Sequence, residues 1–132
     1  MENITKSVVG LLGATISFLF GGWSLLLQVL VFFIVLDYVL GVLVAGTYGK
    51  LSSKVGFRGI AKKVLILALV AVAYSIDKIM GDGTFIRDAV IFFYLANELL
   101  SILETVGKTN LPIPDILKKA VETLSNKSKG DD

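Results

Sequence analysis

The chain contains no cysteine and no histidine. Without cysteine there can be no disulfide, no thiolate metal site and no cysteine nucleophile. Without histidine the commonest general base and the commonest metal ligand are both missing. Only 18% of the 132 residues are charged, which leaves few side chains for acid–base chemistry. We therefore expect no enzymatic activity, no cofactor and no metal site.

Apolar residues are abundant instead. They make up 55% of the chain, against roughly 45–50% in soluble domains when glycine is also counted. The charges are segregated, because long apolar stretches carry almost none. A soluble domain this small has too little interior to hide so much apolar surface. The composition predicts an all-α integral membrane protein.

Three segments are suited to crossing a bilayer, at about residues 23–46, 60–79 and 85–106. A helix needs ~20 apolar residues to cross a hydrocarbon core of ~30 Å. The second segment is apolar only over residues 64–76, but flanking lysines can extend their stems to the interface. Together these segments define a three-span membrane domain over residues 23–106.

The two ends of the chain differ from this domain. Residues 1–22 contain an apolar run, residues 8–20, that is shorter than the ~20 residues of a span. This short N-terminal helix could lie in the interface, pack against a neighbour or cross the membrane. In residues 107–132, apolar positions at helical spacing predict an amphipathic surface helix from Pro114 to about Ser125. The tail beyond it has the composition of a disordered segment.

Cations indicate the orientation. Lysines and arginine gather in the polar loop expected at residues 47–59 and again in the C-terminal segment. Two spans separate these regions, so they lie on the same side of the membrane. The positive-inside rule makes that side cytoplasmic and the turn at residues 81–84 external. Anionic lipid headgroups explain the basic clusters without any nucleic-acid partner.

Polar residues inside the apolar segments are the candidate functional residues. An ionisable group in hydrocarbon must face protein or water, because facing lipid costs a few kcal/mol or more. Asp37 and Glu98 are expected deep in the membrane, with Lys62 or Lys63 as possible partners. The full set of intramembrane polar or gating candidates is Asp37, Lys62, Lys63, Tyr74, Asp77, Arg87, Tyr94, Asn97, Glu98 and Glu104. These residues either line a lesion in an oligomer or face each other within one protomer, and the second arrangement is favoured for the resting state.

Small residues form two helix-packing faces, since small side chains let helices approach closely. Gly41 and Ala45 form one such face on the first span. On the second span the face consists of Ala68, Ala71 and Ser75.

Four patches resemble the toxin-secretion and phage-lysis holin family. They are residues 36–41 (LDYVLG), residues 56–63 (GFRGIAKK), residues 97–104 (NELLSILE), and Gly107 followed by residues 111–114 (LPIP). Their order and spacing among the hydrophobic segments also fit. The resemblance covers roughly residues 30–120 and leaves out residues 1–22.

The resemblance implies a function in the bacterial inner membrane. Such a protein self-associates as a homo-oligomer in the lipid bilayer and opens lesions through which an endolysin or a protein toxin passes. It carries no catalytic residues. Two alternatives stay open from the sequence. One is an antiholin or other regulatory membrane protein, which would bind a holin as its partner, and the other is a subunit of a small ion channel.

Overall fold

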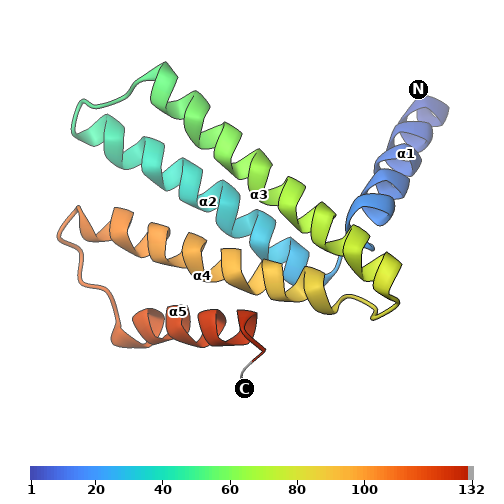
Figure 1. The fold of residues 1–132 in the computed structure, drawn as a ribbon. Coiled ribbons are helices and arrows are strands. Elements are labelled where there is room, and N and C mark those ends of the chain that lie inside the picture. The colour runs from blue at the N-terminus through green and yellow to red at the C-terminus, as the bar shows by residue number, and fades with distance from the viewer. Residues whose placement is uncertain (131–132) are drawn as a thin grey trace.

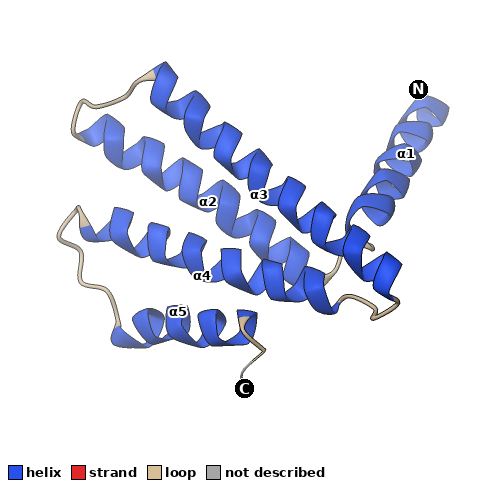
Figure 2. Cartoon of the chain, viewed as in Figure 1, coloured by secondary structure: helices blue, strands red, loops and turns tan. Residues whose placement is uncertain are grey.

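A computed structural model describes residues 1–130 of the chain. Over these residues the fold consists of five helices and contains no strand (Figures 1 and 2). The helices are α1 (Glu2–Phe20), α2 (Leu25–Thr47), α3 (Ser53–Met80), α4 (Phe85–Gly107) and α5 (Asp115–Ser128). The predicted all-α class is confirmed for this part of the chain.

Local capping residues set several of the helix ends. The hydroxyl oxygens of Ser24 and Ser52 accept hydrogen bonds from the backbone N–H groups of Leu27 and Val55, at 3.2 and 3.5 Å. Serine at this position satisfies one of the N–H groups that a helix start leaves free. Gly21 and Gly81 end α1 and α3 in the left-handed conformation, with φ of 76° and 73°. Glycine adopts this conformation without the steric penalty of a side chain.

The prediction of a loop over residues 47–59 is wrong for its second half, because α3 already begins at Ser53. The Ser52 cap starts the helix there, and the polar residues that suggested a loop occupy its first two turns. Gly56 and Gly59 let this part of α3 approach Tyr38 on α2. An added Cβ would lie 3.2 Å from the Tyr38 hydroxyl at Gly56 and 3.5 Å from its ring at Gly59.

The core lies where α2, α3 and α4 meet. It is built from six buried apolar side chains: Leu27, Leu30, Ile34, Val70, Ile91 and Leu95. Helix α4 is central, since it packs against α2, α3 and α5. Burial of these aliphatic side chains stabilises the bundle by roughly 1.5–3 kcal/mol each when water is the reference.

The two terminal helices sit differently against this bundle. Figure 1 shows α1 pointing away from it, and none of the α1 residues is buried. Helix α5 lies alongside α4 and contributes Leu124 to the edge of the core. It ends at Ser128 and so extends past Ser125 into the segment expected to be disordered. The end of that expected tail, residues 131–132, lies outside the described residues.

Among the described residues, four helices are long and apolar enough to cross a membrane, namely α1, α2, α3 and α4. The sequence predicted about three spans. The additional candidate is α1, whose 19 residues include polar residues before the apolar run. At about 1.5 Å per residue it is close to 28 Å long, which nearly matches the hydrocarbon core.

Candidate functional site

A cluster of charges lies inside the bundle, with one ionisable side chain from each of three helices. Lys63 of α3 donates from Nζ to Oδ2 of Asp37 on α2 at 2.5 Å. The same ammonium lies 2.7 Å from both carboxylate oxygens of Glu98 on α4. Ser101, one turn after Glu98, donates its hydroxyl to Oδ1 of Asp37 at 2.8 Å. We call these four residues the charge cluster.

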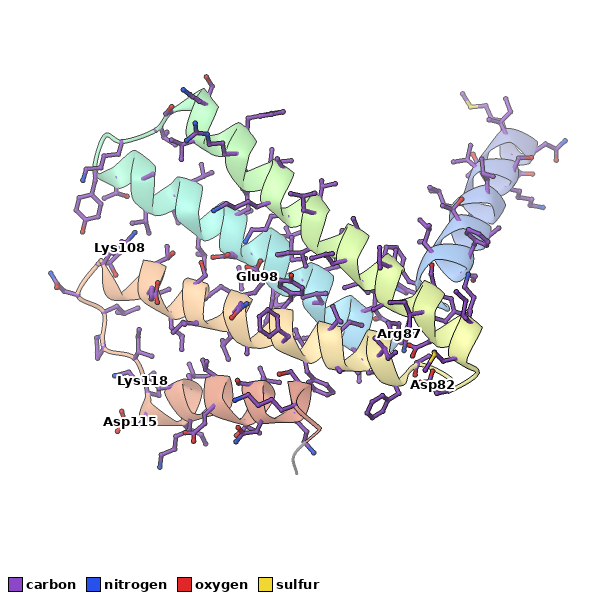
Figure 3. The ribbon with its side chains drawn as sticks, viewed as in Figure 1. Asp82, Arg87, Glu98, Lys108, Asp115 and Lys118 are labelled. Atoms are coloured by element: carbon purple, nitrogen blue, oxygen red, sulfur yellow. The ribbon has the colours of Figure 1, made fainter. Side chains whose placement is uncertain are left out.

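The helices bring these residues to one level. By helix rise, Asp37, Lys63 and Glu98 each lie about 14–15 Å from the nearby end of their helix. Figure 3 shows Glu98 between the helices near the middle of the bundle, with Asp82 and Lys108 at opposite ends. Asp37 is 6% exposed and Glu98 is 3% exposed. Buried charges need partners of opposite charge, and the Lys63 ammonium is the shared partner of both carboxylates.

An open cavity of about 720 Å³ leads to the cluster from the α2–α3 connection. Asp37, Lys63 and Ser101 line it at one end, and Lys50 and Ser52 line it at the connection. Its wall includes Gly41 and Ala45 from α2. These two small residues therefore border a hollow, and a Cβ added at Gly41 would meet nothing within 4 Å.

A second polar centre lies at the turn between α3 and α4. The Asp77 carboxylate accepts the backbone N–H groups of Ile86 and Arg87, both at 2.8 Å. It thereby caps the start of α4, where a negative charge is favoured. The Arg87 guanidinium pairs with Asp88 at 2.8 Å.

The same centre holds the end of α1. Nη1 of Arg87 donates to the Phe20 carbonyl oxygen at 2.7 Å. Lys78 donates to the Phe18 carbonyl oxygen at 3.3 Å. Two cations thus satisfy carbonyls at the C-terminus of α1, where positive charge is stabilising. In the adjoining turn, partial desolvation and the nearby Asp77 carboxylate raise the pKa of Asp82.

The structure divides the predicted site residues into four groups. Asp37, Lys63 and Glu98 come together in the charge cluster, and Asp77 and Arg87 come together at the α3–α4 turn. Two further candidates sit beside aromatic or cationic neighbours, since Tyr94 packs edge-on against Phe93 and the Tyr74 ring lies 5.0 Å from the Lys78 ammonium. The side chains of Lys62, Asn97 and Glu104 are exposed and belong to neither centre.

Most of the small residues predicted for helix packing do not lie in a helix–helix contact within this protomer. On α3, Ala68 and Ser75 are exposed and Ala71 is half-buried. The Ser75 hydroxyl donates to the Ala71 carbonyl oxygen on its own helix at 3.0 Å. Within this protomer the face therefore does not seat another helix.

Two partners were not anticipated from the sequence. Ser101 lies three residues after Glu98, a spacing that puts both on one side of α4, and this helical spacing was a usable signal for its contact with Asp37. The Phe20 carbonyl that Arg87 caps gave no signal, because a backbone acceptor far away in the chain leaves no pattern.

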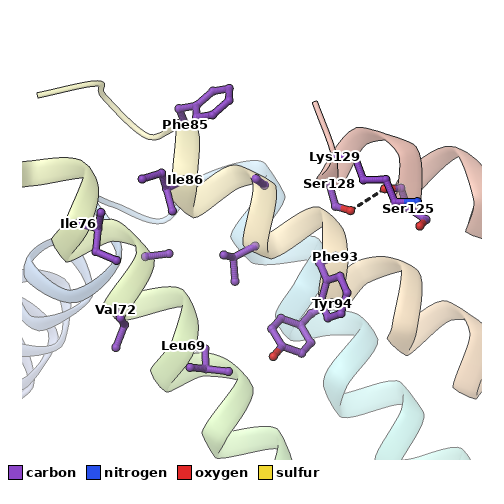
Figure 4. A pocket seen from close by; sticks show the side chains of 13 residues that line it. Leu69, Val72, Ile76, Phe85, Ile86, Phe93, Tyr94, Ser125, Ser128 and Lys129 are labelled. Carbon is purple, nitrogen blue, oxygen red and sulfur yellow. Dashed lines mark hydrogen bonds between the residues drawn. The ribbon is translucent and has the colours of Figure 1, made fainter. Parts of the chain in front are cut away.

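A second cavity, of about 610 Å³, lies between α3, α4 and the end of α5. Figure 4 shows its mostly apolar wall, which includes Leu69, Val72 and Phe93, and the Ser125–Ser128 pair at its rim. There the Ser128 hydroxyl donates to the Ser125 carbonyl oxygen. This cavity holds no charge pair of the kind found in the charge cluster.

The chain is similar in sequence to several known proteins. The model of the bacteriophage holin family matches residues 14–126. An uncharacterised protein of Listeria monocytogenes is 51% identical over 132 residues, covering 100% of this chain and 94% of its own length. One from Listeria innocua is 52% identical over 128 residues, covering 97% and 91%. A 14.9 kDa protein of Clostridium perfringens is 40% identical over 131 residues, covering 96% and 99%. No solved structure matches the chain.

Proposed function

The chain belongs to the bacteriophage holin family and is a multi-pass membrane protein, and we propose that it acts as a holin. In this proposal it accumulates in a bacterial inner membrane, associates with further copies of itself and opens lesions. An endolysin, or a protein toxin, then crosses the membrane. No catalytic step is involved, because the chain only has to change the permeability of the bilayer.

The charge cluster is the observation that carries the mechanism. Apolar side chains cover most of the outer surfaces of α1, α2 and α3, whereas Asp37, Lys63 and Glu98 are turned inward and paired. This arrangement suits a closed protomer surrounded by lipid, because charge that faces hydrocarbon is costly. Opening would exchange the internal partners of these groups for water in the lesion, and the polar stripes of several copies would then line it.

The proposed topology has four spans. Because α1 buries none of its residues against the bundle, lipid or another copy must cover it. The excess of lysines and arginine favours the cytoplasmic side for the α2–α3 connection and for the α4–α5 connection, where the C-terminal segment begins. With α1 crossing as well, the N-terminus is also cytoplasmic and the α3–α4 turn is external.

Inducible expression in a bacterium tests the proposal directly. Expression alone should stop growth and collapse the membrane potential abruptly, while turbidity should clear only when an endolysin is co-expressed. Endolysin expressed without this chain is the control, and it should not clear the culture. The proposal that the chain acts as a holin is refuted if its expression changes neither the membrane potential nor growth.

Two other outcomes would support other functions. Discrete conductance steps with selectivity among small ions would indicate a channel subunit. Absence of lethality, combined with delayed lysis when a separate holin is present, would indicate an antiholin. Either result would replace the lesion mechanism proposed here.

A further inference from the structure

The charge cluster contains two carboxyl groups but only one ammonium. Both carboxyl groups are at least nine-tenths buried, and within residues 1–130 Lys63 is the only cation within bonding distance of either. Fully ionised, the cluster would carry an uncompensated negative charge. An uncompensated charge in a low-dielectric interior is avoided by neutralisation or by binding a counter-charge.

The two carboxyl groups converge on one atom, since Nζ of Lys63 lies 2.5 Å from Oδ2 of Asp37 and 2.7 Å from both carboxylate oxygens of Glu98. Two ionised carboxylates held against one cation also repel each other, because both carry a negative charge. A proton on one of the two removes this repulsion and leaves a single carboxylate to balance Lys63.

We propose that Asp37 and Glu98 form a proton-binding site that holds one exchangeable proton at neutral pH. The proton belongs to the pair, because strongly interacting groups titrate together. With one proton bound, the cluster consists of one carboxylate, one ammonium and one neutral carboxyl group, and its net charge is zero.

No other charged side chain on the surrounding helices compensates the excess. Asp37 is the only charged residue of α2, and the neighbouring Tyr38 lines the cavity. The other charged groups of α3 and α4 are exposed or are paired at the distant α3–α4 turn. The exposed groups are Lys54, Arg58, Lys62 and Glu104. The groups bonded near the α3–α4 turn are Asp77, Lys78, Arg87 and Asp88. The charged side chains of α5 are exposed, and Lys50 lines the cavity at the α2–α3 connection.

The cavity supplies the route for the proton. It extends from Lys50 and Ser52 to Asp37, so water entering from the α2–α3 connection can reach one member of the pair. Glu98 does not line the cavity and exchanges its proton through Asp37. In the proposed topology the connection is cytoplasmic, and the site therefore responds to cytoplasmic pH.

Infrared spectroscopy of the full chain in phosphatidylglycerol–phosphatidylcholine vesicles tests the site. The wild type should show the C=O stretch of a buried protonated carboxyl at neutral pH and lose it at alkaline pH. Glu98→Gln and Asp37→Asn should each abolish this band, because the remaining carboxylate balances Lys63. Lys63→Gln should roughly double it, because both carboxyl groups then bind a proton.

Glu104→Gln is the matched control, since this exposed carboxylate lies on the same helix as Glu98, and it should leave the band unchanged. Circular dichroism of each variant checks that the helices are retained. The site is refuted if the helical wild type has no such band at neutral pH. It is also refuted if the band survives in both Glu98→Gln and Asp37→Asn, or if Lys63→Gln leaves its intensity unchanged.

The proton site also predicts how pH affects the opening of lesions, and this prediction rests on the proposed function. Loss of the proton restores the excess charge and destabilises the closed bundle, so dye release from the vesicles should be faster at alkaline pH. Glu98→Gln should remove that dependence. The two failures are distinguishable: vesicles that show the band but never leak refute only the lesion function, whereas vesicles that leak without the band refute only the proton site.

Discussion

At the scale of single residues, Lys63 forms the ion pairs with both buried carboxyl groups, Asp37 and Glu98. Lys62 and Lys63 are adjacent in sequence and equally cationic, yet only Lys63 points into the bundle. Adjacent helical residues differ by about 100° in direction, so one faces the interior when the other faces outward. Lys63 contacts α2 and α4 at once, and its loss removes two ion pairs from one site.

Lys63→Gln should therefore be the most disruptive of the charge-cluster substitutions. It leaves two buried carboxyl groups that must both take up a proton to avoid unpaired charge, and breaking a buried pair in this way costs about 3–5 kcal/mol. Asp37→Asn and Glu98→Gln each leave a balanced pair, so about 1–3 kcal/mol is expected from the altered hydrogen bonds. Thermal unfolding in detergent measures the order, and lesion onset after induction should advance in the same order.

Lys62→Gln provides the matched control, because it removes the same charge from the next residue, whose side chain is exposed. It should change unfolding by no more than about 0.5 kcal/mol, as surface substitutions usually do. Equal effects of the two lysine substitutions would mean that Lys63 matters for topology and not through its buried partners.

At the scale of elements, α5 is placed in an unexpected way. Its apolar spacing predicted a helix on the membrane surface, whereas the structure packs it along α4. Ile113 lies against Gly107, and Ser128 and Lys129 border the cavity beside Phe93. The helix therefore runs back along α4 for about 21 Å. Its lysines are exposed, and because a lysine facing lipid is costly we expect them to meet water or another copy.

Deleting residues 113–132 should leave membrane insertion intact, because α1 to α4 supply the four candidate spans. Lesion onset should shift, because the outer face of α4 loses its cover. Carbonate extraction of membranes measures insertion, and growth arrest after induction measures timing.

A shorter deletion, residues 129–132, controls for the loss of tail charge and should keep the wild-type schedule. If the longer truncation no longer enters the membrane, α5 is part of the insertion-competent core. The view of α5 as a separable cover on α4 would then be wrong.

At the scale of the whole molecule, the two polar centres lie at different depths. The charge cluster lies well inside the bundle, and the Asp77–Arg87 centre lies at the α3–α4 turn. The second centre also fixes α1 to the bundle through carbonyls at its C-terminus. Helix α1 is therefore attached at one end and free along the rest of its length, which leaves its apolar surface available to lipid or to other copies.

Single cysteines test the topology, since the chain has none of its own. Cysteine at Ser53, or at the exposed Thr109 in the α4–α5 connection, should resist a membrane-impermeant thiol reagent in intact cells before lesions open, and cysteine at Asp82 should react. The physical basis is the excess of cations on the cytoplasmic side. Labelling at Ser53 without labelling at Asp82 would invert the orientation.

The sequence by itself determined the helical class, the membrane setting and the family resemblance. Long apolar runs specify helices locally, because every backbone group in a bilayer must be satisfied within its own segment. Their positions deep inside apolar segments also marked Asp37 and Glu98 as inward candidates, since buried charge must find a partner. These inferences needed only residues close together in the chain.

Tertiary structure decided the rest. Only the relative rotation of three helices selects Lys63 over Lys62 and brings Ser101 to Asp37. The contact of Arg87 with the Phe20 carbonyl depends on a neighbour that is far away in the chain. Composition cannot reveal such contacts, because a hydrogen bond to a distant backbone oxygen leaves no mark on the sequence, whereas a hydrophobic run does.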